Sequence, residues 1–147
     1  MPSIIPSYVY SLFAALVVGT IIIAACSVQT LGIKNEALNQ QLTNISDYVA
    51  TQSLTLLSQS NENTYTTTQY IEIPSQIGNQ IFWLKIANDS SRAWVESGFG
   101  TNATTSQLRV YIPANVVASG TFISGSGRAL LSYHFENQIA TLTLNSE

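Results

Sequence analysis

Residue types that most often perform catalysis are sparse in this 147-residue chain, which contains one histidine and one cysteine. His134 alternates with Ser132 and Glu136, so these three side chains are expected on one face of a β-strand. A Ser-His-acid site would need a serine from a second strand and a nucleophile elbow, and the sequence has no such motif. We therefore expect His134 to be a surface residue and the chain not to be an enzyme.

Metal and cofactor sites are not indicated either. A single cysteine cannot form an internal disulfide or a multi-thiolate metal site. The run Gly125-Ser126-Gly127 lacks the strand-loop-helix context and the following Lys-Ser/Thr of a phosphate-binding loop. No acidic pair has the spacing of calcium-loop ligands, because the acids of the second half stand singly: Glu62, Glu72, Asp89, Glu96 and Glu136. We expect no metal and no cofactor.

The overall charge excludes one large class of function. Five Lys and Arg against eight Asp and Glu give a net charge of −3, and only 9% of residues are charged. Soluble domains carry roughly 25%. No Lys/Arg cluster is present that could neutralise a run of phosphates, so a nucleic-acid-binding protein is excluded.

Three Asn-x-Ser/Thr sequons are candidate sites of N-glycosylation if the second half of the chain is exported. Asn88 and Asn102 fall in predicted loops, whereas Asn44 falls within a predicted helix, where a glycan would require the outward face. Thr and Ser fill the strand positions expected to be exposed, and Lys is nearly absent. This composition is typical of a domain on the outside of a cell.

The first third of the chain predicts a membrane-competent helix. No charged side chain occurs from Met1 to Ile33, and the densest apolar run is Val9 to Val28. Twenty residues at about 1.5 Å per residue match the roughly 30 Å core of a bilayer. A buried helix of a globular core is disfavoured, because apolar residues cover every face.

Three interpretations of this apolar segment compete. A cleaved signal peptide is disfavoured, because the first basic residue is Lys34. The run Ile23-Ala24-Ala25-Cys26 looks like a lipobox, which would make the chain a lipoprotein acylated at Cys26. The preferred interpretation keeps the segment as an anchor or as a helix that packs inside an assembly, with Cys26 a small apolar packing residue.

The helix is expected to continue past the membrane as an amphipathic segment, from near Pro6 to Ser60, with Gly32 as the point most prone to flex. Asn35 and Gln52 interrupt its apolar stripe, which disfavours a coiled coil. We expect the stripe to pack on the chain's own second half, with a neighbouring subunit as the alternative. The stripe consists of Leu31, Leu38, Leu42, Ile45, Val49 and Leu56, widened by Ala50, Leu54 and Leu57.

The second half changes to a period of two and predicts seven short strands, typical of an antiparallel β-sandwich of immunoglobulin-like type. Asn137-Gln138 is expected to join the last two strands as a hairpin. Gly120 suggests an edge strand or a bulged strand. The predicted strands are Thr64–Ile73, Ile81–Ala87, Ala93–Ser97, Gln107–Ile112, Val116–Ser124, Ala129–Glu136 and Ile139–Leu144.

The sequence therefore predicts an α+β protein in two parts. Residues 1–62 form a long N-terminal hydrophobic helix, in which 4–30 are the membrane or filament-core segment and 31–60 the amphipathic half. Residues 63–147 form the β-sandwich domain.

This order of elements resembles the archaeal members of the type IV filament superfamily, namely archaeal pilins, archaellins and archaellum stator proteins. The resemblance covers the whole chain as architecture, and its most family-like stretch is Ala14–Ala25. It implies a pilin-like subunit whose helices pack as a filament core and whose β domains face outward. The residues it places in helix packing are Leu12, Ala15, Leu16, Gly19, Ile22, Ile23 and Cys26.

The resemblance also implies partners and a location. The expected partners are identical subunits, through the N-terminal helix, and the membrane before assembly; contacts with a target surface or an S-layer are further candidates. The expected location is a cell-surface, extracellular filament used in adhesion. The alternative is a membrane-anchored, exported β-sandwich module, such as a stator protein or a lipoprotein-type binding domain.

Overall fold

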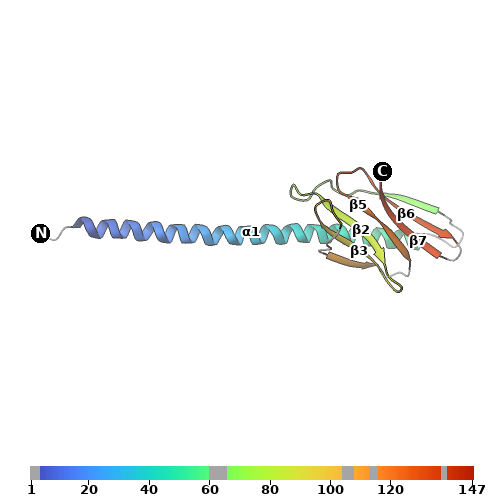
Figure 1. Cartoon of the computed structure of the whole chain (residues 1–147), viewed down its shortest axis with the longest axis horizontal. Helices are drawn as coiled ribbons and strands as arrows, with labels where there is room; N and C mark the ends of the chain where they lie inside the picture. Colours follow the sequence, from blue (N-terminus) through green and yellow to red (C-terminus); the bar gives the residue numbers. More distant parts are fainter. Residues whose placement is uncertain (1–3, 60–65, 104–107, 113–115, 137–138) are drawn as a thin grey trace. The chain divides into compact units, whose positions relative to one another are not determined.

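A computed structural model describes residues 4–59, 66–103, 108–112, 116–136 and 139–147, with side chains from residue 8 onward. It contains one helix followed by seven strands (Figure 1). The helix is α1 (Ile4–Gln59), and the strands are β1 (Thr66–Ile71), β2 (Phe82–Asn88), β3 (Ala93–Phe99), β4 (Leu108–Ile112), β5 (Val117–Ile123), β6 (Ala129–Glu136) and β7 (Ile139–Ser146). The α+β layout expected from the sequence is confirmed, and the Asn137-Gln138 hairpin lies outside the described residues.

Helix α1 is a single element of 56 residues, as the absence of interior proline after Pro6 predicts. Gly32 does not end it. The chain nevertheless divides into two compact units, residues 1–37 and residues 38–147, so the boundary falls inside α1. The predicted boundary near residue 62 corresponds to the end of the helix, whereas the unit boundary marks where helix side chains become buried.

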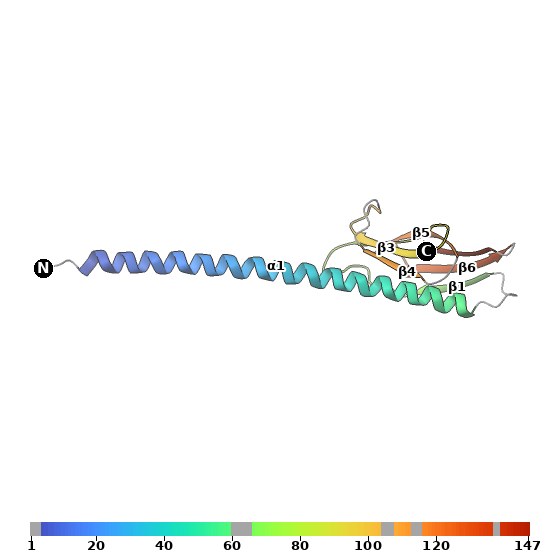
Figure 2. The ribbon, with the colours of Figure 1, turned by 90° about the horizontal axis from the view of Figure 1, so that it is seen from below.

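The second unit includes the C-terminal part of α1, which lies along one face of the sheet (Figure 2). The expectation that the amphipathic stripe packs on the chain's own second half is confirmed from Leu38 onward. Leu31 was expected in this stripe, but its side chain is 61% exposed. The fully or nearly fully buried positions recur every three or four residues, as one helical face requires: Leu38, Leu42, Ser46, Val49, Ala50, Ser53 and Leu56.

Two polar contacts join this part of α1 to the strands. The hydroxyl groups of Ser46 and Ser97 lie 2.9 Å apart in a hydrogen bond between α1 and β3, and both residues are fully buried. Gln52 interrupts the apolar stripe in the sequence, and its Oε1 accepts a hydrogen bond of 3.0 Å from Nε2 of Gln69 in β1. Small hydroxyls and a paired amide therefore satisfy polar groups that would otherwise be costly to bury.

The seven strands are hydrogen-bonded in the order β1-β6-β7-β5-β2-β3-β4. Neighbouring strands are antiparallel except β5 and β7, which are parallel. Strand β5 pairs with β7 through residues 117–120 and with β2 through residues 121–123. It thereby joins two halves of the sheet whose inward side chains meet in one core.

Gly120 stands where β5 changes partner. The sequence suggested an edge strand or a bulge here, but β5 lies in the interior of the sheet order, so the edge assignment is wrong. The backbone of Gly120 has φ +119, and a Cβ built on it would lie 2.1 Å from the carbonyl oxygen of Leu144. Glycine is required because both the conformation and the close approach to β7 exclude a side chain.

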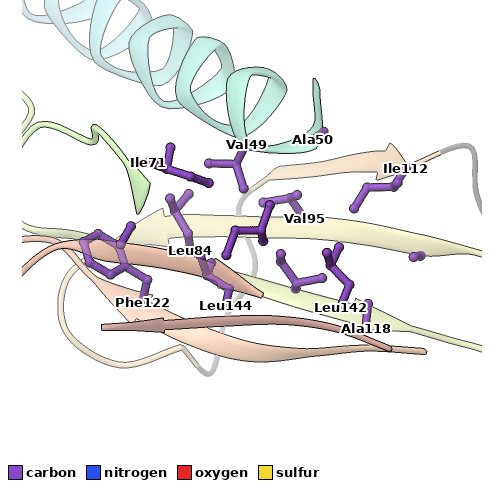
Figure 3. Close-up of a cluster of buried hydrophobic side chains, with 14 of the residues drawn as sticks. Val49, Ala50, Ile71, Leu84, Val95, Ile112, Ala118, Phe122, Leu142 and Leu144 are labelled. Atoms are coloured by element: carbon purple, nitrogen blue, oxygen red, sulfur yellow. The ribbon is translucent and has the colours of Figure 1, made fainter. Parts of the chain in front are cut away.

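The core lies between α1 and the inward faces of both sheet halves. Figure 3 shows Val49 of α1 above Leu84 and Val95, with Phe122 and Leu144 beyond them. Period-two burial in β3, β4 and β6 follows the alternation read from the sequence. Trp83 is only 1% exposed although it points away from this core, and its indole packs on Gly98.

Candidate functional sites

The residues predicted to pack in a filament core lie on the first unit's part of α1. Leu12, Leu16, Ile22 and Ile23 are each 56–69% exposed, and the thiol of Cys26 is exposed. Among the described residues of this unit, all large apolar side chains are exposed, from Tyr8 to Ile33. The seven predicted positions recur at intervals of three and four, so they share one helical face: Leu12, Ala15, Leu16, Gly19, Ile22, Ile23 and Cys26.

Helix α1 is long and apolar enough to cross a membrane. By length and composition a signal sequence or the core helix of a soluble protein can meet the same test, but a core helix is mostly buried. The most apolar window of α1 is 0% buried. Its exposure disfavours a core helix of this chain and leaves a membrane-inserted helix or a signal sequence.

The three sequons occupy different environments. Asn44 is exposed, and its Oδ1 accepts a hydrogen bond of 3.1 Å from Nε2 of Gln40. Asn102 is exposed, while Thr104 of its sequon lies outside the described residues. Asn88 is half-buried, and both ends of its amide are engaged: Oδ1 accepts from the N–H of Ala118, and Nδ2 donates to the carbonyl of Asp89, both at 3.0 Å. Ser46 of the Asn44 sequon is fully buried against Ser97. Glycosylation remains a prediction, and this geometry favours Asn102 over Asn44 and Asn88.

His134 is exposed on β6, and it takes part in a chain of polar contacts that sequence spacing did not reveal. Oγ1 of Thr66 in β1 lies 2.9 Å from its Nδ1, and Oε2 of Glu136 lies 3.1 Å from its Nε2. The register of β1 with β6 places Thr66 directly opposite His134, which is why reading β6 alone could not find it. The order hydroxyl, imidazole, carboxylate is that of a nucleophilic triad.

Solvent surrounds this triad-like group. The side chains of His134 and Glu136 are 48% and 69% exposed. A carboxylate in water stabilises an imidazolium only weakly, and a hydroxyl nucleophile also needs donors aimed at the developing oxyanion in a site that excludes water. The arrangement therefore supports strand pairing between β1 and β6 rather than catalysis.

A second group lies on the outer face of β2, β3 and β4, and sequence reasoning missed it. We name this group the cation–aromatic face. It consists of strand residues and of Arg92, which directly precedes β3 and lies over Tyr111: Lys85, Arg92, Trp94, Glu96, Arg109 and Tyr111. The guanidinium of Arg109 lies 4.5 Å from the ring centroid of Trp94, and that of Arg92 lies 5.8 Å from the ring centroid of Tyr111. The two rings meet edge to face, 6.2 Å apart. The two rings thus lie in the middle of the group, and each carries one cation on its outer side.

Glu96 holds this arrangement together. Its Oε1 accepts hydrogen bonds from Nε1 of Trp94 at 2.9 Å and from the guanidinium of Arg109 at 2.6 Å. Burial alone would raise the pKa of Glu96, but the bonds from Trp94 and Arg109 outweigh it, so the pKa lies below its usual value. The alternation of Arg109 and Tyr111 on the wet face of β4 was the available signal. The sequence could not show which residues of β3 lie opposite them, because that depends on the register between the two strands.

Among the described residues, no group of three or more His, Cys, Asp or Glu side chains is placed to hold a metal ion. Comparison with protein-family models, curated proteins and solved structures finds no match to this chain. Any function must therefore be argued from the apolar helix and from the surfaces of the β unit.

Proposed function

We propose that this chain is a structural subunit of an archaeal type IV pilus-like surface filament, with apolar helices packed as the core and β domains exposed. The observation that carries the proposal is the uncovered apolar half of α1, in a helix whose other half is built into a folded β unit. One continuous helix can thus connect an assembly core to an outward domain.

The apolar half of α1 requires a cover. It presents on the order of 1,000 Å² of apolar surface, and at about 25 cal/mol per Å² its removal from water is worth on the order of 25 kcal/mol. Lipid provides that cover before assembly. Neighbouring helices replace lipid in a polymer, because small residues such as Ala15 and Gly19 let backbones approach closely.

The alternative is a membrane anchor for an exported β module, held either by the same apolar helix or by a lipid on Cys26. A stator-like protein would keep lipid around α1 permanently. A lipoprotein would begin at an acylated Cys26, and intact-mass measurement of native protein would then lack the first 25 residues.

A charge placed in the helix distinguishes a polymer core from an anchor. Ile21→Asp introduces a carboxylate that costs about 2.5–3.5 kcal/mol even in a lipid-embedded helix. A single anchor tolerates this by shifting its register, whereas a filament repeats the buried charge in every subunit, next to like charges. We expect Ile21→Asp protein to be absent from surface filaments examined by electron microscopy.

Thr68→Asp is the matched control, because Thr68 is exposed on β1 and the change adds the same charge. We expect Thr68→Asp protein to form normal filaments. Normal filaments from Ile21→Asp protein would refute the proposal. Wild-type protein found only as a discrete membrane complex would establish the anchor instead.

A further inference from the structure

The basic residues of this acidic chain are concentrated on one face. The sequence contains five Lys and Arg, and three of them, Lys85, Arg92 and Arg109, belong to the cation–aromatic face. The one acidic member of that face, Glu96, has a side chain only 12% exposed beneath Arg109. Asp89 is exposed and interacts with Arg92, to whose N–H its Oδ1 is hydrogen-bonded. Three cations against the carboxylates of Asp89 and Glu96 still leave this region with a positive balance, on a chain whose net charge is −3.

The two guanidinium groups of this face lie against aromatic rings before any ligand binds. Arg109 is fixed by its ion pair with Glu96 and by the ring of Trp94, yet its side chain is 45% exposed. Arg92 is exposed and lies over Tyr111, whose side chain is 53% exposed. Guanidinium groups stacked on rings keep outward N–H donors for carboxylates and lose little side-chain entropy on binding.

Hydroxyl groups border the charged face. Thr121 of β5 stands directly opposite Lys85. Beyond it, a cross-strand row of outward hydroxyls runs over β5, β7, β6 and β1, with neighbours paired by register: Ser119, Thr143, Ser132 and Thr68. Such uncharged groups hydrogen-bond readily to the hydroxyls of sugars.

We propose that the cation–aromatic face binds an acidic polysaccharide, a polymer of sugar rings that carry carboxylate groups. The cations of the face can pair with carboxylates of the polymer, and the exposed ring of Tyr111 offers an apolar surface on which a sugar ring can stack. This activity is separate from polymerisation, because every residue that carries it belongs to one β unit.

Two other polyanions fit the face less well. Recognition of anionic membranes relies on clusters of 4–8 Lys and Arg, more than the three cations present on this face. Duplex DNA carries one charge per about 1.7 Å, which demands a dense basic stripe, and the chain is acidic overall.

The test measures binding of the full chain in uncharged detergent micelles to polygalacturonate, with dextran as the uncharged polysaccharide. We expect the wild-type chain to bind polygalacturonate, to bind dextran much more weakly, and to lose affinity as salt is raised. The double variant K85Q/R92Q should bind about tenfold more weakly, since it removes the half-buried Lys85 cation and the exposed Arg92 cation and spares the Glu96–Arg109 pair.

Arg128→Gln supplies the matched control, because Arg128 lies outside the face and carries the same charge as each residue replaced. Its affinity should stay within about twofold of wild type. Tyr111→Ala, which changes no charge, should weaken binding of polygalacturonate while near-UV circular dichroism confirms a folded β unit. Three results would overturn the proposal. The wild-type chain does not bind polygalacturonate, or Arg128→Gln loses as much affinity for it as K85Q/R92Q does. The third is that the wild-type chain binds duplex DNA or anionic phosphatidylserine vesicles more tightly than it binds polygalacturonate.

Discussion

Gly120 is the residue on which the exchange of partners within β5 depends. Alanine at this position meets two penalties, the positive φ of +119 and the contact with the carbonyl oxygen of Leu144. Gly100 has a similar φ of +100, but a Cβ there would have no neighbour within 4 Å. Comparing the two positions separates backbone strain from the clash with β7.

We expect Gly120→Ala to lower the free energy of unfolding by about 3 kcal/mol or more, and Gly100→Ala by about 1 kcal/mol. Urea unfolding of the full chain in detergent, followed by tryptophan fluorescence, measures both. Equal losses for the two variants would show that the contact with Leu144 contributes nothing beyond strain.

At the same scale, residue type predicted exposure more reliably than it predicted partners. His134 was expected at the surface from the period-two alternation of its strand, and it is exposed. Its contact with Thr66 was not expected, nor was that of Arg109 with Trp94, because each contact joins strands whose register is set by the whole sheet. Asn88 shows the same limit. The sequence predicted it in a loop, whereas it is the last residue of β2 and its Oδ1 accepts a hydrogen bond from the N–H of Ala118 in β5.

At the scale of elements, α1 is one helix in two environments. Leu31 and Leu42 belong to the same apolar stripe in the sequence, yet their side chains are 61% and 1% exposed. Leu42→Ala should therefore reduce the free energy of unfolding of the β unit by about 2–5 kcal/mol, because it leaves a cavity between helix and sheet.

Leu31→Ala is the control for the Leu42 variant. It removes the same atoms from an exposed position outside the β unit, so its unfolding midpoint in urea should be unchanged. If Leu31→Ala lost as much stability as Leu42→Ala, the packed stripe would have to begin before Leu38. If neither lost stability, α1 would not be part of the folded β unit.

At the scale of the whole molecule, every residue of the buried core cluster comes from Leu38 onward. We therefore expect the fragment 35–147 to fold without detergent, with Asn35 available as an N-cap for the shortened helix. Size-exclusion chromatography and near-UV circular dichroism should show a soluble monomer whose spectrum matches that of the full chain.

A shorter fragment provides the contrast. Fragment 48–147 lacks Leu38, Leu42 and Ser46, three buried helix positions. It should be unfolded or aggregated under the same conditions, because one side of the core is open to water. A soluble, native-like 48–147 would mean that the sheet needs only the last turns of α1.

The sequence by itself determined the long helix, the seven strands and the division into apolar, amphipathic and β segments, because these follow from periodicities of 3.6 and two that each segment carries locally. Only the tertiary structure decided that the packed stripe begins at Leu38 rather than Leu31, that β5 lies inside the sheet, and that Arg92 and Arg109 lie over the rings of Tyr111 and Trp94. The physical reason is that local pattern fixes which face of an element is apolar, whereas register and packing fix which other element covers it.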